Sequence, residues 1–162
     1  IILFAAVSEE LVFRGILFQT ALDKKSETVV TLAFSGSFAL LHLPNPNINI
    51  IGLINIFLAG IVLSAMFLRT YSLWLPIGFH FGWNFWQSVI LDSPISGTYF
   101  GLHIFQTKLT EFNQIIFGGN FGIEGGIVGS LALCIFCLIT FKRFKPIPHI
   151  YSRILRERYS MQ

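Results

Sequence analysis

The sequence predicts an all-α polytopic membrane protein, a bundle of about five transmembrane helices with an amphipathic segment at the membrane interface. Composition is the first reason, because hydrophobic residues make up 54% of the chain and charged residues only 12%. That is about half the charged share of a soluble domain. The second reason is that the apolar residues lie in blocks close to the ~20 residues with which a helix crosses a bilayer. Lipid is therefore the expected solvent of this chain.

Five apolar segments account for the predicted helices, and in chain order they are residues 1–22, 28–43, 50–68, 73–91 and 125–141. Polar residues interrupt the first two segments, whereas the other three carry no charged residue. The second segment ends at residues 44–47 (PNPN) and the fourth at residues 92–94 (DSP), because proline lacks the N–H that a continuing helix needs. Since the chain opens on the apolar Ile1 rather than on a Met, we expect further helices upstream.

The connection between the fourth and fifth segments has a helical pattern of its own. Polar side chains fall on one side of a helical wheel and apolar ones on the other, at Ile104, Phe105, Leu109, Phe112, Ile115 and Ile116. The pattern predicts an amphipathic helix in the membrane interface, or an ordinary packed loop helix. Beyond it, Gly118, Gly122 and Gly126 recur at every fourth residue, a spacing that favours close packing of helices in lipid.

The basic residues predict how the helices are oriented. They flank the helices rather than forming one patch, which argues against a nucleic-acid partner despite the formal charge of +3. Nine of the eleven Lys and Arg residues follow the first, third or fifth segment. Because Lys and Arg are enriched in cytoplasmic loops, the turn at Lys24, the turn at Arg69 and the C-terminus are expected in the cytoplasm, with Lys108 outside.

Six polar side chains interrupt the apolar segments: Glu9, Glu10, Arg14, His42, His80 and Asn84. Ionisable residues inside a span are unfavourable and usually mark a functional site. With a rise of about 1.5 Å per residue, three segments carry these side chains to similar depths, roughly 12–22 Å above the cytoplasmic turns. We therefore expect one shared site. Polar contacts that only join helices, and a proton-coupled transporter, are the alternatives.

Helical spacing gives the two neighbouring glutamates different surroundings. Glu10 and Arg14 lie four residues apart, so they share a helix face and can form an ion pair. Successive residues point about 100° apart on a helix, which leaves Glu9 free to meet His42.

These residue types favour hydrolysis of an acyl compound by water. No Ser or Cys lies beside the histidines as a nucleophile, so water is the expected attacking group, with a carboxylate or a histidine as general base. An amide and a histidine can donate hydrogen bonds to the developing oxyanion. A metal site built from His42, His80 and Glu9 is the alternative. Because the HExxH spacing of common zinc proteases is absent, we expect a site without metal or other cofactor.

Three motifs coincide with these residues, each in a separate apolar segment. They are EExxxR at residues 9–14, followed by Gly15, FxxxH at residues 38–42 and HxxxN at residues 80–84. In these motifs and their order the chain resembles the CPBP, or Abi, family of intramembrane glutamic endopeptidases, which includes CAAX prenyl proteases and bacteriocin-processing enzymes. The resemblance extends over residues 1–141, which we interpret as the protease core, and leaves residues 142–162 as a basic cytoplasmic tail.

The resemblance implies roles for the site residues and a class of substrate. Glu9 and His42 would activate the attacking water, and Glu10 with Arg14 would support and orient Glu9. His80 and Asn84 would form the oxyanion hole. The implied substrate is a membrane-embedded or lipidated peptide or protein, and the short loops and basic tail favour a prokaryotic cell membrane. A non-enzymatic transporter or immunity-type membrane protein is the remaining alternative.

Overall fold

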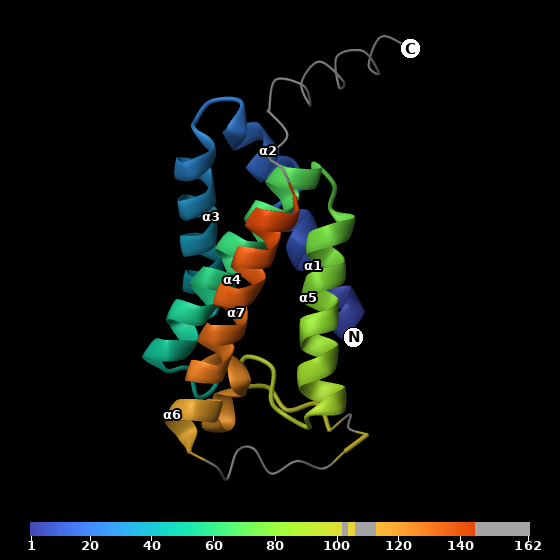
Figure 1. Ribbon diagram of the computed structural model, residues 1–162. Coiled ribbons are helices and arrows are strands. Elements are labelled where there is room, and N and C mark those ends of the chain that lie inside the picture. Colours follow the sequence, from blue (N-terminus) through green and yellow to red (C-terminus); the bar gives the residue numbers. More distant parts are fainter. Residues whose placement is uncertain (102–103, 106–112, 145–162) are drawn as a thin grey trace.

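The computed structural model describes residues 1–101, 104–105 and 113–144. In this part of the chain the regular structure is helical, and an isolated bridge between Ile95 and Thr98 is the one extended pairing. Figure 1 shows the longer helices side by side as a bundle. The all-α prediction is confirmed. The middle of the predicted amphipathic helix, with Lys108, lies outside the described residues, and so does most of the predicted basic tail.

The first apolar segment forms two helices, α1 (Ile2–Phe13) and α2 (Ile16–Leu22), in place of the single helix that we expected. The break falls at Gly15, directly after the EExxxR motif. Here the chain passes so close to the preceding turn that a Cβ atom on Gly15 would lie 2.1 Å from the Leu11 carbonyl oxygen. The prediction of one continuous helix over residues 1–22 is therefore wrong, because the chain turns at Gly15, where a side chain would overlap the Leu11 carbonyl group.

Polar caps begin the next two helices. α3 (Glu27–Leu41) follows Ser26, whose hydroxyl accepts a hydrogen bond from an N–H of the first turn. α4 (Ile50–Thr70) follows Asn49, whose side-chain oxygen accepts from the backbone in the same way. Among the described helices, α4, with 21 residues, is the one that is long and apolar enough to cross a membrane, and α3 is apolar but shorter. The number of five spans stays a prediction.

Two further long helices complete the bundle, in agreement with the predicted fourth and fifth segments. They are α5 (Trp74–Phe85), which continues into the π-helical turn η1 (Trp86–Ile90), and α7 (Ile127–Arg143). Between them lie the short α6 (Gln114–Phe117) and the two 3-10 turns η3 (Gly119–Phe121) and η4 (Ile123–Gly125).

The glycines ahead of α7 serve turns more than helix packing. Gly118 and Gly122 both lie in the left-handed region of backbone conformation, with φ of +81° and +96°. The role in helix packing that we predicted from their spacing is therefore wrong for these two residues. Farther along, Gly129 does allow a close approach, because a Cβ atom there would lie 2.5 Å from the Ile123 carbonyl oxygen.

The central helix of the bundle is α4, against which α3, α5 and α7 all pack. Figure 1 shows α3, α4 and α7 next to one another. α4 approaches α3 closely at Gly60, where a Cβ atom would lie 2.9 Å from Ser35 Cα. Near one end of the bundle, the buried Phe18 ring meets Phe34 and Phe67 edge-on, with ring centroids 5.3 and 5.7 Å away. These contacts join α2, α3 and α4.

The turns that carry basic residues lie at one end of the bundle. Figure 1 shows the connection between α2 and α3, the connection between α4 and α5, and the end of α7 together at this end. Arg69 joins two of them, because its Nε donates to the Phe144 carbonyl oxygen over 3.0 Å and its guanidinium lies 3.9 Å from the centroid of the Phe141 ring.

The contact at Gly60 gives a stability prediction. Gly60→Ala should lower the free energy of unfolding by about 1–3 kcal/mol, because its new methyl group would overlap the α3 backbone and separate the two helices. Gly36→Ala is the matched control in α3, since a Cβ atom at Gly36 meets nothing within 4 Å. Thermal unfolding of both variants in the same detergent measures the difference, and equal midpoints would contradict the close packing described here.

Candidate active site

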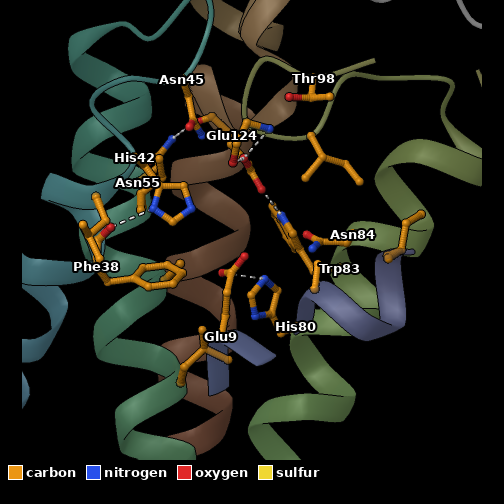
Figure 2. Close-up of a pocket in the computed structure, with 18 of the residues that line it drawn as sticks. Glu9, Phe38, His42, Asn45, Asn55, His80, Trp83, Asn84, Thr98 and Glu124 are labelled. Atoms are coloured by element: carbon orange, nitrogen blue, oxygen red, sulfur yellow. Dashed lines mark hydrogen bonds and ion pairs between the residues drawn. The ribbon is translucent and has the colours of Figure 1, made fainter. Parts of the chain in front are cut away.

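A cavity of about 400 Å³ lies inside the bundle, and four of the six predicted site residues line it. They are Glu9 from α1, His42 at the end of α3, and His80 and Asn84 from α5. Figure 2 shows these four side chains around a common space. The prediction that three separate segments bring polar groups to one place is confirmed. The rest of the wall is largely apolar.

The other two predicted residues, Glu10 and Arg14, form a buried ion pair that does not line the cavity. Arg14 Nη1 donates to Glu10 Oε1 over 3.0 Å, and both side chains are 0% exposed. Arg14 Nη2 donates to the carbonyl oxygen of Gly60 on α4, also over 3.0 Å. The predicted pairing at four-residue spacing is confirmed, and the contact with Gly60 fixes α1 against the central helix.

His80 contacts both glutamates of the first motif. Its Nδ1 lies 3.0 Å from Glu10 Oε1, and its Nε2 lies 3.8 Å from Glu9 Oε2. We had expected Glu9 to meet His42 and Glu10 to orient Glu9. In the structure Glu10 orients His80 instead, because α1 packs against α5 and turns both carboxylates toward it. Within the described chain, no hydrogen bond or ion pair joins Glu9 to His42.

The position of His42 is set by the residue four places before it. The His42 Nδ1 lies 2.7 Å from the Phe38 carbonyl oxygen, and the two rings are 4.6 Å apart between centroids. Since a carbonyl oxygen only accepts hydrogen bonds, Nδ1 must carry the proton of the neutral imidazole. The lone pair is then on Nε2, the atom that remains to accept a proton or a hydrogen bond.

Phe38, the other residue of the FxxxH motif, contacts both histidines and the guanidinium of the ion pair. Its ring centroid lies 6.3 Å from that of His80, with the planes at 83°. The guanidinium of Arg14 lies 5.1 Å from the same centroid, within the range of a cation–π contact. The phenylalanine of this motif is therefore in contact with both parts of the site.

Asn84 lies one helical turn beyond His80 on the cavity wall. Its side chain is 6% exposed. In the described part of the chain its amide forms no hydrogen bond with another residue, so its donor is available to a group in the cavity.

One cavity residue that we did not predict is Glu124, in the turn η4. Its Oε1 accepts a hydrogen bond from Trp83 Nε1 over 3.0 Å, and its Oε2 accepts from the backbone N–H and the hydroxyl of Ser96, over 3.0 and 2.6 Å. Figure 2 shows Glu124 and Trp83 joined in this way, with Asn84 beside Trp83. The available signal in the sequence was an acidic residue between glycines, directly before an apolar helix.

The geometry does not suit the metal site considered as an alternative. Across the residues that the structure describes, no three His, Cys, Asp or Glu side chains come close enough together to hold a metal ion.

The cavity thus brings acidic, imidazole and amide groups together inside an all-helical bundle. A family model for type II CAAX prenyl endopeptidases, Rce1-like, matches residues 1–86, just over half of the chain, and this range includes all three motifs. The chain belongs to the type II CAAX prenyl endopeptidase Rce1-like family, and it is therefore a membrane protease. The family resemblance noted from the motifs is confirmed. No curated protein and no solved structure matches the chain.

The buried ion pair gives a second prediction. Arg14→Ala should lower the free energy of unfolding by about 3–5 kcal/mol, because it leaves Glu10 as an uncompensated buried charge. The double variant Arg14→Met, Glu10→Gln removes both charges and should be more stable than Arg14→Ala alone. Thermal unfolding in one detergent compares them. A single variant as stable as the double variant would show that the two charges do not depend on each other.

Proposed function

We propose that this protein is an intramembrane glutamic endopeptidase that hydrolyses peptide bonds of membrane-associated peptides or proteins. The observation that carries the proposal is the shared cavity, in which Glu9, His42, His80 and Asn84 meet from three different segments. Family membership supports the reaction class.

The attacking water is activated between Glu9 and His42. The Glu9 side chain is 35% exposed, and its Oε2 has no hydrogen-bond partner among the described residues, so the carboxylate is free to accept a proton from water. His42 Nε2, whose lone pair faces away from Phe38, accepts the second hydrogen of the same water and orients it. The hydroxide formed in this way attacks the carbonyl carbon of the scissile peptide bond.

The oxyanion of the tetrahedral intermediate is stabilised by Asn84 and His80. Asn84 donates from its amide nitrogen, and His80 donates from Nε2 when both of its ring nitrogens carry a proton. Glu9 then gives the proton that it took from water to the leaving nitrogen as the C–N bond breaks. The two products are a carboxylic acid and an amine, and no other reactant is required.

Glu10 and Arg14 have a positioning role in this proposal. Glu10 Oε1 accepts from both Arg14 and His80, so the ion pair holds the His80 ring at the cavity wall. The resemblance alone assigned this support to Glu9, and the contacts favour His80.

The proposed substrate is a peptide that reaches the cavity with apolar groups attached or adjacent. The family description supports a membrane-associated peptide. The mostly apolar wall, with Leu63, Phe79 and Leu133, suits apolar side chains or a lipid group.

We also propose five spans, formed by α1 with α2, α3, α4, α5 with η1, and α7, in a prokaryotic cell membrane with the C-terminus in the cytoplasm. The support is that the turns near Lys24 and Arg69 and the end of α7 at Lys142 lie at one end of the bundle (Figure 1). Basic residues at one end of a helical bundle favour the cytoplasmic side.

The mechanism predicts that Glu9→Gln abolishes cleavage and leaves the fold intact. Loss of a general base lowers rates on the order of 10²–10⁴-fold, whereas glutamine keeps the shape of the side chain. Glu27→Gln, which changes an exposed glutamate in the first turn of α3, is the matched control and should cleave like the wild type. The assay uses purified protein with three fluorogenic substrates: a farnesylated peptide ending in a CAAX sequence, the same peptide without the lipid, and a transmembrane peptide. Cleavage by Glu9→Gln at the wild-type rate would contradict the proposed mechanism.

The topology predicts which positions an impermeant thiol reagent reaches. Single cysteines at Lys24, Lys108 and Lys142 are placed in a background in which Cys134 and Cys137 are replaced by Ala. In intact cells the cysteine at position 108 should react from outside, and the other two should react only after the membrane is permeabilised. Labelling at position 142 in intact cells would reverse the proposed orientation.

A further inference from the structure

Glu124 connects three parts of the chain, and Figure 2 shows it at the end of the cavity opposite to Glu9. Its two carboxylate oxygens accept from Trp83 on α5 and from Ser96 in the loop that follows η1. The turn that carries Glu124 is itself fixed to α4, because Asn55 Nδ2 donates to the carbonyl oxygens of Glu124 and Gly126 over 2.7 and 3.0 Å. Asn55 is 1% exposed. The carboxylate is therefore attached to the central helix through a buried amide.

The Ser96 end of this connection is held in an unfavourable backbone conformation. Ser96 has φ of +45°, in the left-handed region that residues with a side chain seldom adopt. Both hydrogen bonds to Glu124 Oε2, together with the bridge between Ile95 and Thr98, hold the loop in this shape. Ile95, Ser96 and Thr98 all line the cavity, so the loop forms part of its wall.

The Trp83 end lies inside the HxxxN motif, directly before Asn84. The Trp83 ring stacks on Phe79 and meets Phe136 of α7 edge-on, both with ring centroids 6.4 Å away. Two residues beyond Asn84 the α-helical pattern gives way to the π-helical turn η1. The end of α5 is thus fixed from outside the helix, by the rings and by the hydrogen bond to Glu124.

We propose that Glu124 is a positioning residue of the site: its carboxylate holds Trp83 and Ser96, and thereby fixes Asn84 relative to Glu9 and His42. This inference rests on the function proposed above. The three donors around the Glu124 side chain explain why a carboxylate is needed at this position. The indole N–H and the backbone N–H are donors only, and the Ser96 hydroxyl also donates here. A carboxylate supplies two acceptor atoms for these three donors, whereas the amide of glutamine supplies one acceptor and one donor.

The closing experiment is a double-mutant cycle on cleavage, with Glu124→Gln, Trp83→Phe and the variant that carries both changes. Phenylalanine keeps an aromatic ring at position 83 but lacks the N–H that reaches Glu124. Displacement of a reacting group by a fraction of an ångström to 1 Å lowers rates by up to about 10²-fold, so we expect each single change to lower kcat at least about tenfold. Glu124 and Trp83 both line the cavity, so KM is measured beside kcat, and a positioning role predicts that the larger loss is in kcat.

Losses of kcat that do not add in the double variant would show that Glu124 acts through Trp83. If Glu124 acts through Trp83, the double variant should lose no more kcat than the worse single variant. Glu124→Asp, which keeps the charge and both acceptors, should retain more kcat than Glu124→Gln. Tyr99→Phe is the control in the same loop. It removes the hydroxyl that donates to Asp92 over 2.5 Å at the exposed side, and it should cleave like the wild type.

The outcomes of this experiment distinguish a failure of this inference from a failure of the proposed function. Rates are referred to folded protein, measured by size exclusion and thermal unfolding in the same detergent, and the substrate is the one that the wild type cleaves fastest. If Glu9→Gln is inactive but Glu124→Gln has the wild-type kcat, the role of Glu124 is wrong and the proposed function stands. If the double variant loses the product of the two single losses, Glu124 does not act through Trp83. If Glu9→Gln cleaves normally, the proposed function itself fails.

Discussion

The buried ion pair between Arg14 and Glu10 is the interaction on which the rest of the site depends. Both side chains are 0% exposed, and a charge in such a place is stable only when it is paired. The pair extends to α4 through Gly60 and to α5 through His80. A single guanidinium and a single carboxylate therefore connect α1 to both helices, and the remaining parts of the site are arranged around these contacts.

The carboxylates of Glu9, Glu10 and Glu124 differ in the hydrogen bonds that they accept from protein. Glu10 Oε1 accepts from two cationic or imidazole groups, and both oxygens of Glu124 accept hydrogen bonds from protein. Glu9 alone among these three has only the 3.8 Å contact with His80. Glu10 Oε2, like Glu9 Oε2, has no hydrogen-bond partner among the described residues. What separates the two glutamates is that Arg14 and His80 hold Glu10 Oε1, whereas the described residues give Glu9 no hydrogen bond.

Irregular backbone lies next to three of the six predicted site residues. α1 ends at Arg14, α3 ends at His42, and the π-helical turn begins two residues after Asn84. Non-helical backbone within a membrane bundle is tolerated where it is enclosed by protein or lines a cavity. π-helical turns also occur frequently at functional sites. Helix ends and interruptions thus bring side chains to the cavity that a set of uninterrupted helices would direct elsewhere.

The sequence by itself determined the helical class, four of the five apolar segments as continuous helical stretches, the three motifs, and the pairing of Glu10 with Arg14. These features depend on composition and on spacing along one helix, which local geometry fixes. Tertiary structure alone decided that His80 lies against Glu10, and that Glu124 joins Trp83 to Ser96 at the cavity wall. His80 and Glu10 are 70 residues apart, and Ser96 and Glu124 are 28 apart. Such contacts depend on how each helix is rotated about its axis when it packs, and that rotation is set by neighbours such as Gly60 and Gly129 rather than by periodicity along the chain.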